Sequence, residues 1–245
     1  MTSTIPRKRA LVTGGSGGIG SAICRQLAAD GFHVIVHAHR SLEAAQTLVD
    51  AIKAADGYAQ ALAFDVTDAA ATAAALETLL ADGPIQVVVN NAGIHDDAIF
   101  PGMQLGQWQR VIDVSLNGFF HVTQPLMMPM IRTRWGRIIN ITSVAAVAGN
   151  RGQVNYSAAK GALHSATRSL ALEVASRGIT VNAVAPGIIA TAMSQQTFDA
   201  PTIAQLVPMK RAGRPEEVAS LVSFLASERA AYISGQIISI NGGMI

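Results

Sequence analysis

Tyr156 and Lys160 are the residues whose types and spacing most directly suggest acid–base chemistry. They stand four residues apart in a stretch of helical composition, so their side chains would share one face of a helix. A free phenol has a pKa of about 10, which is too high for ready proton exchange at neutral pH, but a neighbouring ammonium group lowers it. Ser143 lies thirteen residues before Tyr156, at the end of an apolar run, where its hydroxyl could hold a substrate carbonyl. On its own, the Tyr–Lys spacing is common and usually marks a surface pair.

A glycine-rich segment near the N-terminus has the composition of a phosphate-binding loop. It follows a short apolar run, leads into a helical stretch, and reads Thr13-Gly14-Gly15-Ser16-Gly17-Gly18-Ile19-Gly20. Glycines let the backbone turn sharply and approach a pyrophosphate, and the helix N-terminus supplies free N–H groups and partial positive charge. This position favours nucleotide binding over a merely flexible loop. The register stays open, because two dinucleotide fingerprints fit: Gly15/Gly17/Gly20 and Gly14/Gly18/Gly20.

The end of the second predicted strand indicates which nicotinamide cofactor would bind. An NAD site usually has Asp or Glu there, about 20 residues past the loop, to hold the ribose hydroxyls. This sequence instead reads His37-Ala38-His39-Arg40-Ser41 and offers no carboxylate. Arg40 and Ser41 could hold a 2′-phosphate, which predicts NADP(H). The alternative is that Arg40 is a solvated loop residue.

Short apolar runs alternate along the chain with longer alanine-rich stretches. The runs have strand length and cover 10–13, 34–36, 61–64, 87–89, 138–141, 181–184 and 237–240. The stretches between them have helical length and composition and cover 19–29, 42–55, 69–80, 107–131, 155–177 and 216–226. Parallel strands need such long crossovers, and strands that are apolar throughout fit a sheet covered on both faces. The pattern predicts an α/β fold: a single Rossmann-like, doubly wound domain with a parallel sheet of about seven strands and helices on both faces.

The composition narrows the possible classes of protein. The 245 residues are 50% hydrophobic and 14% charged, with a formal net charge of +2. No linker, composition shift or repeat divides them, so we expect residues 1–245 to form one domain. The apolar fraction excludes intrinsic disorder, and the small net charge gives no reason to expect nucleic-acid binding. With the single cysteine Cys24, neither an internal disulfide nor a multi-cysteine zinc site can form.

Membrane and metal signals are also missing from the sequence. It has no run of about 20 apolar residues, and the first apolar run, at 10–12, is far too short for a secretory signal. We therefore expect a cytoplasmic protein with no membrane segment. His95, His121 and His164 show no metal-ligand spacing with carboxylates, so we expect no metal site.

Several motifs together resemble, in order and spacing, those of the short-chain dehydrogenase/reductase family. They are Thr13-Gly14-x-x-x-Gly18-x-Gly20, Asp65-Val66, Asn90-Asn91-Ala92-Gly93, Ser143, Tyr156-x-x-x-Lys160 and Pro186-Gly187. The resemblance covers essentially the whole chain, and the joint pattern is highly specific. Within the family the chain looks most like the 3-oxoacyl-[acyl-carrier-protein] reductases, through Tyr156-Ser157-Ala158-Ala159-Lys160, residues 173–182 and Asn241-Gly242-Gly243-Met244.

The resemblance implies a role for each catalytic residue. Tyr156 would be the general acid that protonates the carbonyl oxygen as hydride arrives from the nicotinamide. Lys160 would lower the tyrosine pKa and hold the nicotinamide ribose, and Ser143 would polarise the carbonyl. The segment 188–210, rich in Thr, Gln and Pro, is then expected to be a substrate lid.

The resemblance also implies a set of NADP(H) contacts. Asp65 and Val66 would contact the adenine, residues 91–93 the adenosine ribose side, and Ile189 and Thr191 the carboxamide. The full expected cofactor set is Gly14, Ser16, Gly18, Ile19, Gly20, Arg40, Ser41, Asp65, Val66, Asn91, Ala92, Gly93, Tyr156, Lys160, Pro186, Gly187, Ile189 and Thr191.

Three departures from the family pattern bear on the site. Many NADP-dependent members carry a basic residue at the position of Gly17, so Arg40 would hold the phosphate without that help. The family's catalytic asparagine opens a pattern like Asn-Leu-x-Gly, which here reads Ser115-Leu116-Asn117-Gly118. Alignment gives the role to Ser115, because Asn117 lies two positions further, roughly 200° around a helix. The family's Thr-Arg-Asp is replaced by His95-Asp96-Asp97, so the substrate mouth is expected to differ.

The leading interpretation is NADPH-dependent reduction of a 3-oxoacyl thioester, on acyl carrier protein, to the 3-hydroxyacyl thioester. Two alternatives stay open: a reductase of acetoacetyl-CoA or another small ketone, and a non-catalytic dinucleotide-binding sensor. The acyl length and the pathway, primary fatty-acid synthesis or a specialised polyene or polyketide line, also stay open. The resemblance implies a homotetramer, with the helices at 107–131 and 155–177 as one interface. It also implies docking of the acidic carrier protein at Arg134 and Arg177, whose alternative role is plain surface solubility.

Overall fold

A parallel sheet of seven strands forms the middle of the molecule in the computed structural model, which describes residues 7–191 and 199–245. Its strands are β1 (Arg9–Val12), β2 (His33–Ala38), β3 (Tyr58–Ala63), β4 (Val87–Asn90), β5 (Gly136–Ile141), β6 (Ile179–Pro186) and β7 (Ile237–Ile240). They lie in the order β3-β2-β1-β4-β5-β6-β7, and each neighbouring pair is parallel. Strands β1, β4, β5 and β6 are buried along their whole length, as expected for a sheet covered on both faces.

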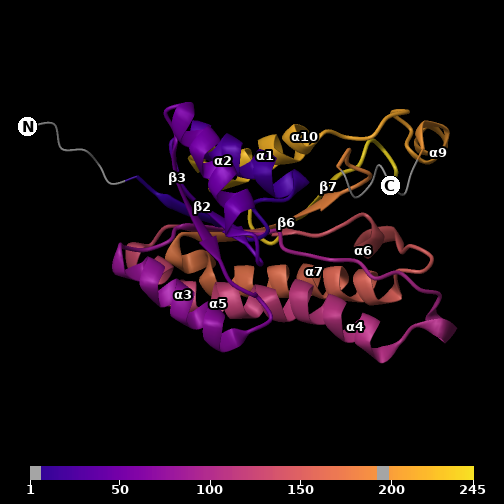
Figure 1. Ribbon diagram of the computed structural model, residues 1–245, viewed down its shortest axis with the longest axis horizontal. Coiled ribbons are helices and arrows are strands. Elements are labelled where there is room, and N and C mark those ends of the chain that lie inside the picture. Colours follow the sequence, from indigo (N-terminus) through magenta and orange to yellow (C-terminus); the bar gives the residue numbers. More distant parts are fainter. Residues whose placement is uncertain (1–6, 192–198) are drawn as a thin grey trace, which may run out of the picture.

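Helices cover both faces of this sheet (Figure 1). One layer contains α1 (Gly18–Ala29), α2 (Leu42–Ala54) and α10 (Pro215–Ala226). The other contains α3 (Ala69–Ala81), α4 (Leu105–Ile112), α5 (Gly118–Thr133) and α7 (Val154–Val174). Two short helices, α6 (Ala145–Ala148) and α9 (Ala200–Leu206), lie with α4 towards one end of the molecule. The predicted Rossmann-like, doubly wound α/β fold is confirmed.

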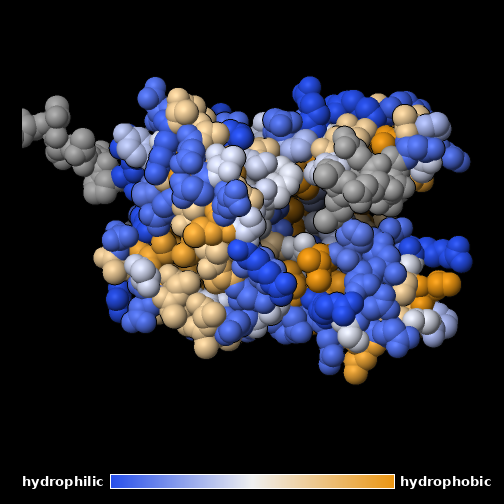
Figure 2. Space-filling model, in the orientation of Figure 1, coloured by the Kyte–Doolittle hydropathy of each residue, from blue (hydrophilic) through white to orange (hydrophobic). Residues whose placement is uncertain are grey.

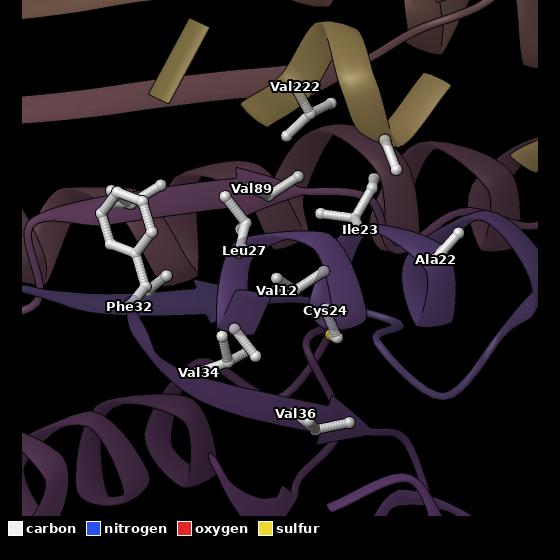
Figure 3. Packing of buried hydrophobic residues seen from close by; sticks show 14 of the residues in the cluster. Val12, Ala22, Ile23, Cys24, Leu27, Phe32, Val34, Val36, Val89 and Val222 are labelled. Carbon is white, nitrogen blue, oxygen red and sulfur yellow. The ribbon is translucent and has the colours of Figure 1, made fainter. Parts of the chain in front are cut away.

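A hydrophobic cluster under α1 fixes the sheet against the first helical layer. Ile23 and Leu27 of α1 point towards Val222 of α10, and the strand residues Val12 and Val89 lie beside them in the same cluster (Figure 3). All five side chains are fully buried, and each burial stabilises the fold by about 1.5–3 kcal/mol. A second cluster under α3, α5 and α7 packs on the opposite face. The loops that follow the strands therefore start from a rigid base.

The strand order places a ligand crevice beside β1. Strands β2 and β3 extend to one side of β1, and β4 to β7 extend to the other. In open parallel sheets ligands bind at such a switch point, outside the carboxyl ends of the strands. The segments that leave the sheet there are the glycine loop after β1 and residues 91–93 after β4.

The predicted elements agree with the observed ones to within a few residues at their ends, except in one place. The stretch predicted as one helix over 107–131 contains α4 and α5 separated by a π-helical segment, Asp113–Asn117. The helix predicted over 155–177 ends at Val174 and continues as a 3₁₀ turn, Ala175–Arg177. Helices α6 and α9 are too short, at four and seven residues, to show a sequence period.

Candidate active site

The glycine loop after β1 is tightly folded, and side chains are disfavoured at Gly14 and Gly20 for different reasons. Gly14 has a φ of 61°, in the left-handed region that favours glycine. At Gly20 a Cβ would lie 2.2 Å from the Gly14 carbonyl oxygen and 2.8 Å from Asn91 Nδ2. Gly17 caps α1 without a side-chain bond, which leaves the first N–H groups of the helix without a side-chain acceptor. This backbone could receive a pyrophosphate at the expected residues Gly14, Ser16, Gly18, Ile19 and Gly20.

Asn91 ties the glycine loop to the end of β4. Its Nδ2 donates to the carbonyl oxygens of Thr13 and Gly14, at 2.9 and 3.0 Å. The backbone N–H groups of Asn91 and Ala92 each donate to Thr13 Oγ1 at 3.0 Å. The structure thus brings together the segments expected to contact the pyrophosphate and the adenosine ribose.

His37 holds the same loop, and the sequence interpretation did not place it in the site. The side chain is buried, its Nδ1 accepts from the Gly14 N–H at 3.0 Å, and its Nε2 donates to the Phe64 carbonyl at 2.9 Å. Burial lowers the pKa of His37 to about 4, although the bond to Phe64 opposes the shift. The ring is therefore neutral and joins the loop to the ends of β2 and β3. A polar residue inside an otherwise apolar strand is the signal that could have found it, because a buried imidazole must have partners.

Cys24 lies beneath the glycine loop and is the only cysteine of the sequence. Its side chain is fully buried, and its thiol donates to the Gly15 carbonyl at 3.8 Å. A Cβ on Gly15 would lie 3.0 Å from the sulfur, so the loop rests directly on the thiol. Burial raises the pKa of the Cys24 thiol, against a small opposing effect of Arg25, and the sulfur is therefore unreactive in the folded state.

The end of β2 carries the side chains expected to select the cofactor. Arg40 and Ser41 are exposed, and Ser41 Oγ also accepts from the Ala44 N–H at 3.3 Å as the N-cap of α2. His39, which was not among the expected site residues, lies with its Nε2 3.1 Å from Asp65 Oδ2. The structure therefore adds an imidazole to the arginine and the hydroxyl at this edge.

Asp65 and Val66 follow β3 at the same edge of the sheet. Asp65 Oδ1 accepts from the backbone N–H and the hydroxyl of Thr67, at 2.9 and 2.8 Å. Burial would raise the pKa of Asp65, but the bonds from Thr67 and the neighbouring His39 outweigh it and lower that pKa. Val66 is buried, and its carbonyl oxygen accepts from His121 Nδ1 at 2.8 Å.

The expected carboxamide contacts lie on the other side of the switch point. Pro186 ends β6, and its carbonyl oxygen accepts from the Val144 N–H at 2.8 Å. Gly187 donates its N–H to β7, and Ile189 is buried beyond it. A Cβ on Gly18 would lie 2.8 Å from Thr191 Cγ2, so Thr191 faces the glycine loop across the crevice.

Tyr156, Ser143 and Lys160 meet beyond the carboxyl end of β5. The Tyr156 side chain, in the first turn of α7, lies close enough to the Ser143 hydroxyl for that group to lower the tyrosine pKa. Ser143 Oγ also accepts from the Ala145 N–H at 3.1 Å, which fixes the hydroxyl at the start of α6. Lys160 is buried one turn further along α7, where its Nζ donates to the Ile141 carbonyl at 2.8 Å and lies 5.9 Å from the centre of the Tyr156 ring.

Burial sets the protonation of this group. It raises the pKa of Tyr156, which the neighbouring Ser143 hydroxyl lowers and the charge of Asp97 raises further. Burial also lowers the pKa of Lys160 to about 8. Tyr156 therefore holds its proton at neutral pH, as a general acid must before it donates. Ser143 and Asp97, rather than Lys160, shift the tyrosine pKa here, so the lowering expected from the lysine stays a prediction.

Ser115 lies behind the same group, inside the π-helical segment. It is 3% exposed, and its Oγ has no hydrogen-bond partner among the described residues. A Cβ on Gly93 would lie 3.0 Å from Lys160 Nζ and 3.7 Å from Ser115 Oγ, so both side chains reach one point beside Gly93. Asn117 is exposed, and its Nδ2 donates to Asp113 Oδ1 at 2.7 Å. Of the two candidates, Ser115 is the one beside the lysine.

The departure at His95-Asp96-Asp97 forms a network in the loop after β4, at the position where the family resemblance implies the substrate entrance. Asp96 is ion-paired with Arg110 of α4. Asp97 pairs with His95 Nδ1 at 3.2 Å and accepts from Gln153 Nε2 at 2.9 Å. The entrance is thus built from acidic side chains that are held by neighbours on α4 and just before α7.

Asn155 is a second position that the sequence interpretation did not assign. It is fully buried, and its Nδ2 donates to the carbonyl oxygens of Asp96 and Gln107, at 2.9 and 3.2 Å. Its Oδ1 accepts from the Tyr156 N–H at 2.8 Å. Asn155 therefore joins the entrance to the turn that carries the tyrosine. Only its place directly before Tyr156 could have drawn attention to it.

Part of the lid predicted over 188–210 lies outside the described residues, because 192–198 are not among them. Asp199 begins the described remainder as the N-cap of α9. A cavity of about 350 Å³ lies between this segment and the ends of β6 and β7, and its lining includes Ile188, Val207 and Met209. Apolar side chains are visible along the seam between the two helical layers on the face shown in Figure 2.

Arg134 and Arg177 lie together at the opposite edge of the sheet. Arg134 ends α5 with a φ of 51°, and its Nη2 donates to the carbonyl oxygen of Ser176, next to Arg177, at 3.1 Å. Both arginines are exposed and directly precede β5 and β6. They therefore mark the amino ends of the strands, whereas Ser143 and Tyr156 lie beyond the carboxyl ends. The structure does not bring the two arginines to the chain's own site.

Among residues 7–191 and 199–245, no group of three or more His, Cys, Asp or Glu is placed to hold a metal ion. His164 Nε2 donates to Thr142 Oγ1 at 3.0 Å, and His121 Nδ1 donates to the Val66 carbonyl. In the same described part of the chain, no helix is both long and apolar enough to cross a membrane.

The fold and the site together define a class: a doubly wound α/β domain with a glycine loop beside a Ser–Tyr–Lys group. The sequence model of the short chain dehydrogenase family matches residues 8–202, and the chain belongs to this family. It is therefore an oxidoreductase that acts on a ketone or an alcohol. Members of the family bind a nicotinamide dinucleotide. The residues present fit that group, because the glycine loop leads directly into the N-terminus of α1, which has no side-chain cap.

Individual relatives are similar over nearly their whole length. The chain is 44% identical over 239 residues to the 3-oxoacyl-[acyl-carrier-protein] reductase FabG of Aggregatibacter actinomycetemcomitans, covering 96% of this chain and 98% of that protein. It is 47% identical over 238 residues to the 3-oxoacyl-[acyl-carrier-protein] reductase of Synechocystis, covering 96% of each. It is 44% identical over 248 residues to Nodulation protein G of Azospirillum brasilense, covering 97% and 98%. The predicted resemblance to the 3-oxoacyl-[acyl-carrier-protein] reductases is confirmed.

Proposed function

We propose that this protein uses NADPH to reduce a 3-oxoacyl thioester on acyl carrier protein to the 3-hydroxyacyl thioester. The observation that carries the proposal is the juxtaposition of Ser143, Tyr156 and buried Lys160 beyond the carboxyl end of β5, with Lys160 Nζ 5.9 Å from the centre of the Tyr156 ring. The names of the FabG relatives supply the substrate class. The chemistry of a Ser–Tyr–Lys group next to a dinucleotide loop fits reduction of a carbonyl.

The side chains divide the work of the reduction. NADPH, when bound, supplies the hydride. Tyr156 donates its proton to the carbonyl oxygen as negative charge develops there, and its raised pKa keeps the proton in place until then. Ser143 donates a hydrogen bond to the same oxygen and orients it. Lys160, fixed by the Ile141 carbonyl, holds the nicotinamide ribose and stabilises the tyrosinate that is left behind.

Ser115 takes part in returning the proton to Tyr156. Its unpartnered Oγ lies beside Gly93 and Lys160, where it can hold a water that links the lysine to solvent. A serine hydroxyl is shorter than the amide that the family pattern places there, but it offers both a donor and an acceptor.

Arg40 and Ser41 provide the basis for preferring NADPH over NADH. Both follow β2 at the edge where Asp65 lies, and no carboxylate stands between β2 and α2. Arg40→Asp should reverse the preference, because a carboxylate repels the 2′-phosphate and accepts from the ribose hydroxyls. The ratio of kcat/KM for NADPH to that for NADH should fall at least tenfold. Equal use of both cofactors by the unaltered enzyme would contradict the proposal.

One assay series tests the reaction and its alternatives. NADPH oxidation is followed with acetoacetyl-CoA and with 3-oxoacyl carrier proteins of several chain lengths, for the natural chain and for Tyr156→Phe. We expect a higher kcat/KM on carrier-protein substrates and a loss of about 10²–10⁴-fold in the variant. Turnover of acetoacetyl-CoA alone would instead identify a small-ketone reductase. Binding of NADPH with no turnover of any thioester would identify a dinucleotide sensor.

The proposal includes a cytoplasmic homotetramer. Phe120 and Met128 of α5 and Leu172 of α7 are 61%, 56% and 86% exposed, which gives the outer face of these helices an apolar surface suited to a second copy. A carrier protein docked at Arg134 and Arg177 is at the wrong edge to serve the same chain's site. Docking there would serve a site only if oligomerisation brought the site of another subunit to that edge, so carrier docking and oligomerisation are proposed together.

A further inference from the structure

His39 is a titratable side chain at the cofactor edge that the expected set of contacts does not include. It directly precedes Arg40, its side chain is 54% exposed, and its Nε2 lies 3.1 Å from Asp65 Oδ2. Its Nδ1 has no hydrogen-bond partner among the described residues. The end of β2 is fixed against the glycine loop, because the Gly15 N–H donates to the His37 carbonyl at 2.8 Å. His39 therefore has a defined place beside the adenosine end of the crevice.

Asp65 is a difficulty for phosphate binding at this edge. Burial would raise its pKa, but the bonds from Thr67 and the charge of His39 lower it, so Asp65 is anionic at neutral pH. A carboxylate next to a phosphate dianion repels it and weakens binding. A protonated His39 offsets the Asp65 charge through Nε2–H and keeps a second donor, Nδ1–H, for an incoming anion. A neutral imidazole bonded to Asp65 through Nε2–H has no second donor.

The other charged groups around His39 do not titrate in its place. His37 precedes it on β2, but burial holds that pKa at about 4, so it stays neutral. Arg40 follows it and is permanently charged. Glu43 lies in the first turn of α2. The glycine loop, residues 13–20, contains no charged side chain. Among the described groups at this edge, His39 is thus the exposed imidazole, and histidine is the side-chain type that can take up a proton near neutral pH.

We propose that the His39–Asp65 pair makes recognition of the 2′-phosphate proton-linked. Protonated His39 binds the 2′-phosphate of NADP(H), so binding takes up a proton, and selectivity over NAD(H) rises as the pH falls. The phosphate favours the protonated imidazole, and by reciprocity the proton favours the phosphate. NAD(H) has no 2′-phosphate and gains nothing from this charge. The inference rests on the proposed preference for NADPH and adds the pH dependence of that preference.

Calorimetric binding of NADP⁺ and NAD⁺, without substrate, tests the proposal. Each is titrated between pH 6 and 8.5 in two buffers of different ionisation enthalpy, for the natural chain, His39→Asn and His39→Arg. The natural chain should take up more protons per NADP⁺ bound than His39→Asn. From pH 6 to pH 8.5, the dissociation constant of the natural chain for NADP⁺ should rise by a factor three to ten times larger than that of His39→Asn, since one proton is involved. The comparison cancels the titration of the phosphate itself, which has a pKa of about 6. His39→Arg should bind NADP⁺ tightly at every pH.

His95→Asn is a matched control, because His95 also pairs with an aspartate, Asp97, at 3.2 Å but lies at the substrate entrance. Its NADP⁺ profile should follow that of the natural chain. Parallel profiles for the natural chain and His39→Asn would overturn the inference, as would equal effects of His39→Asn on NAD⁺ and NADP⁺. If NADP⁺ is preferred at every pH without a His39-dependent slope, only this inference fails. If NADP⁺ is never preferred, the proposed NADPH dependence fails with it.

Discussion

Lys160 is a single residue whose buried charge lowers the stability of the fold while it serves the proposed reaction. It is 3% exposed, and burial lowers its pKa to about 8, against about 10.4 in an unfolded chain. The unfolded chain therefore binds this proton more tightly, and below pH 8 the buried charge costs the fold up to about 3 kcal/mol. The cost declines as the pH rises from about 8 to 10.4 and is absent above that window, because both states are then neutral.

Lys160→Met should accordingly make the protein more stable and inactive. At pH 7 we expect a gain of about 1–3 kcal/mol, reduced by the lost bond to Ile141, which corresponds to a Tm higher by several degrees. The gain should shrink by pH 9.5. Thermal melts of both proteins at the two pH values provide the measurement, and a variant less stable at pH 7 would show that the lysine is paired better than its burial suggests.

Ser115 gives a second prediction for one side chain. Ser115→Ala should lower kcat roughly tenfold, a loss of ~1.4 kcal/mol in the transition state, with KM nearly unchanged, because the proposed water acts in the proton step. Ser115→Asn should retain activity, since an amide can hold the same water. Asn117→Ala should change kcat less than twofold, because Asn117 bonds Asp113 at the surface. Steady-state kinetics of the three variants provide the measurement. If Ser115→Ala left kcat unchanged and Asn117→Ala abolished activity, the role would belong to Asn117 instead.

Residue types in the site were predictable, but their partners were not. Tyr156 and Lys160 follow from a helical spacing, and Ser143 follows from the end of a strand. The bonds of Asn155 to Asp96 and Gln107 cross the fold between segments that lie 59 and 48 residues apart, and no local pattern encodes such contacts. His39 was missed for the same reason, because its partner Asp65 leaves a different strand.

The glycine turn is the feature to test at the scale of an element. Gly20→Ala should weaken NADP⁺ binding at least tenfold, because the added Cβ would lie 2.2 Å from the Gly14 carbonyl oxygen and 2.8 Å from Asn91 Nδ2. These atoms shape the turn, so the variant should also melt at a lower temperature. Gly17→Ala is the matched control, since its Cβ would lie 3.4 Å from the same carbonyl oxygen, an ordinary contact.

Equilibrium binding of NADP⁺, with circular dichroism to confirm the fold, provides the measurement. A Gly20→Ala variant that binds as well as Gly17→Ala would show that the turn can relax. It would also remove the steric reason for glycine at this position.

Strands and long helices were predictable because their burial leaves a pattern in the sequence. Strands covered on both faces are apolar throughout. The edge strand β7, whose residues are only partly buried, was also predicted at its observed bounds, Ile237–Ile240. The π segment Asp113–Asn117 was not predictable, because one wide turn inside an otherwise helical stretch leaves the composition unchanged. At its end a Cβ on Gly118 would lie 2.9 Å from Val66 Cγ2, so α5 is packed closely against the loop after β3. Ser115 reaches Lys160 through this long-range packing.

At the scale of the whole molecule, a prediction concerns Arg134 and Arg177, which lie at the edge of the sheet opposite the active site. Arg134→Glu or Arg177→Glu should raise KM for carrier-protein substrates roughly tenfold, a loss of ~1.4 kcal/mol, because the carrier protein is acidic. KM for acetoacetyl-CoA should stay unchanged, and high salt should reproduce the effect in the natural chain. Arg25→Glu, an exposed charge reversal on α1, is the control. If both classes of substrate suffer alike, the two arginines do not dock the carrier.

The overall architecture was predictable from the alternation of apolar runs and helical stretches along the 245 residues. The separation of the arginines from the site was not, although each lies only two residues before a strand. In the sequence Arg134 stands nine residues from Ser143, yet the whole of β5 lies between them. Two residues that are close in sequence can therefore lie far apart in space when a strand separates them, because the two ends of the strand lie at opposite edges of the sheet.

Because Cys24 lies under the glycine loop, the rate at which a thiol reagent labels it reports how often that loop opens. A thiol reagent can alkylate the sulfur only while the loop or α1 is open, so the labelling rate reports the free energy of that opening. A dinucleotide bound across the loop stabilises the closed loop and therefore slows the labelling of Cys24, whichever substrate the enzyme uses. With one cysteine in the sequence, no other site competes for the reagent. Cofactor occupancy could thus be read in crude extracts by mass spectrometry, without a substrate or a dye.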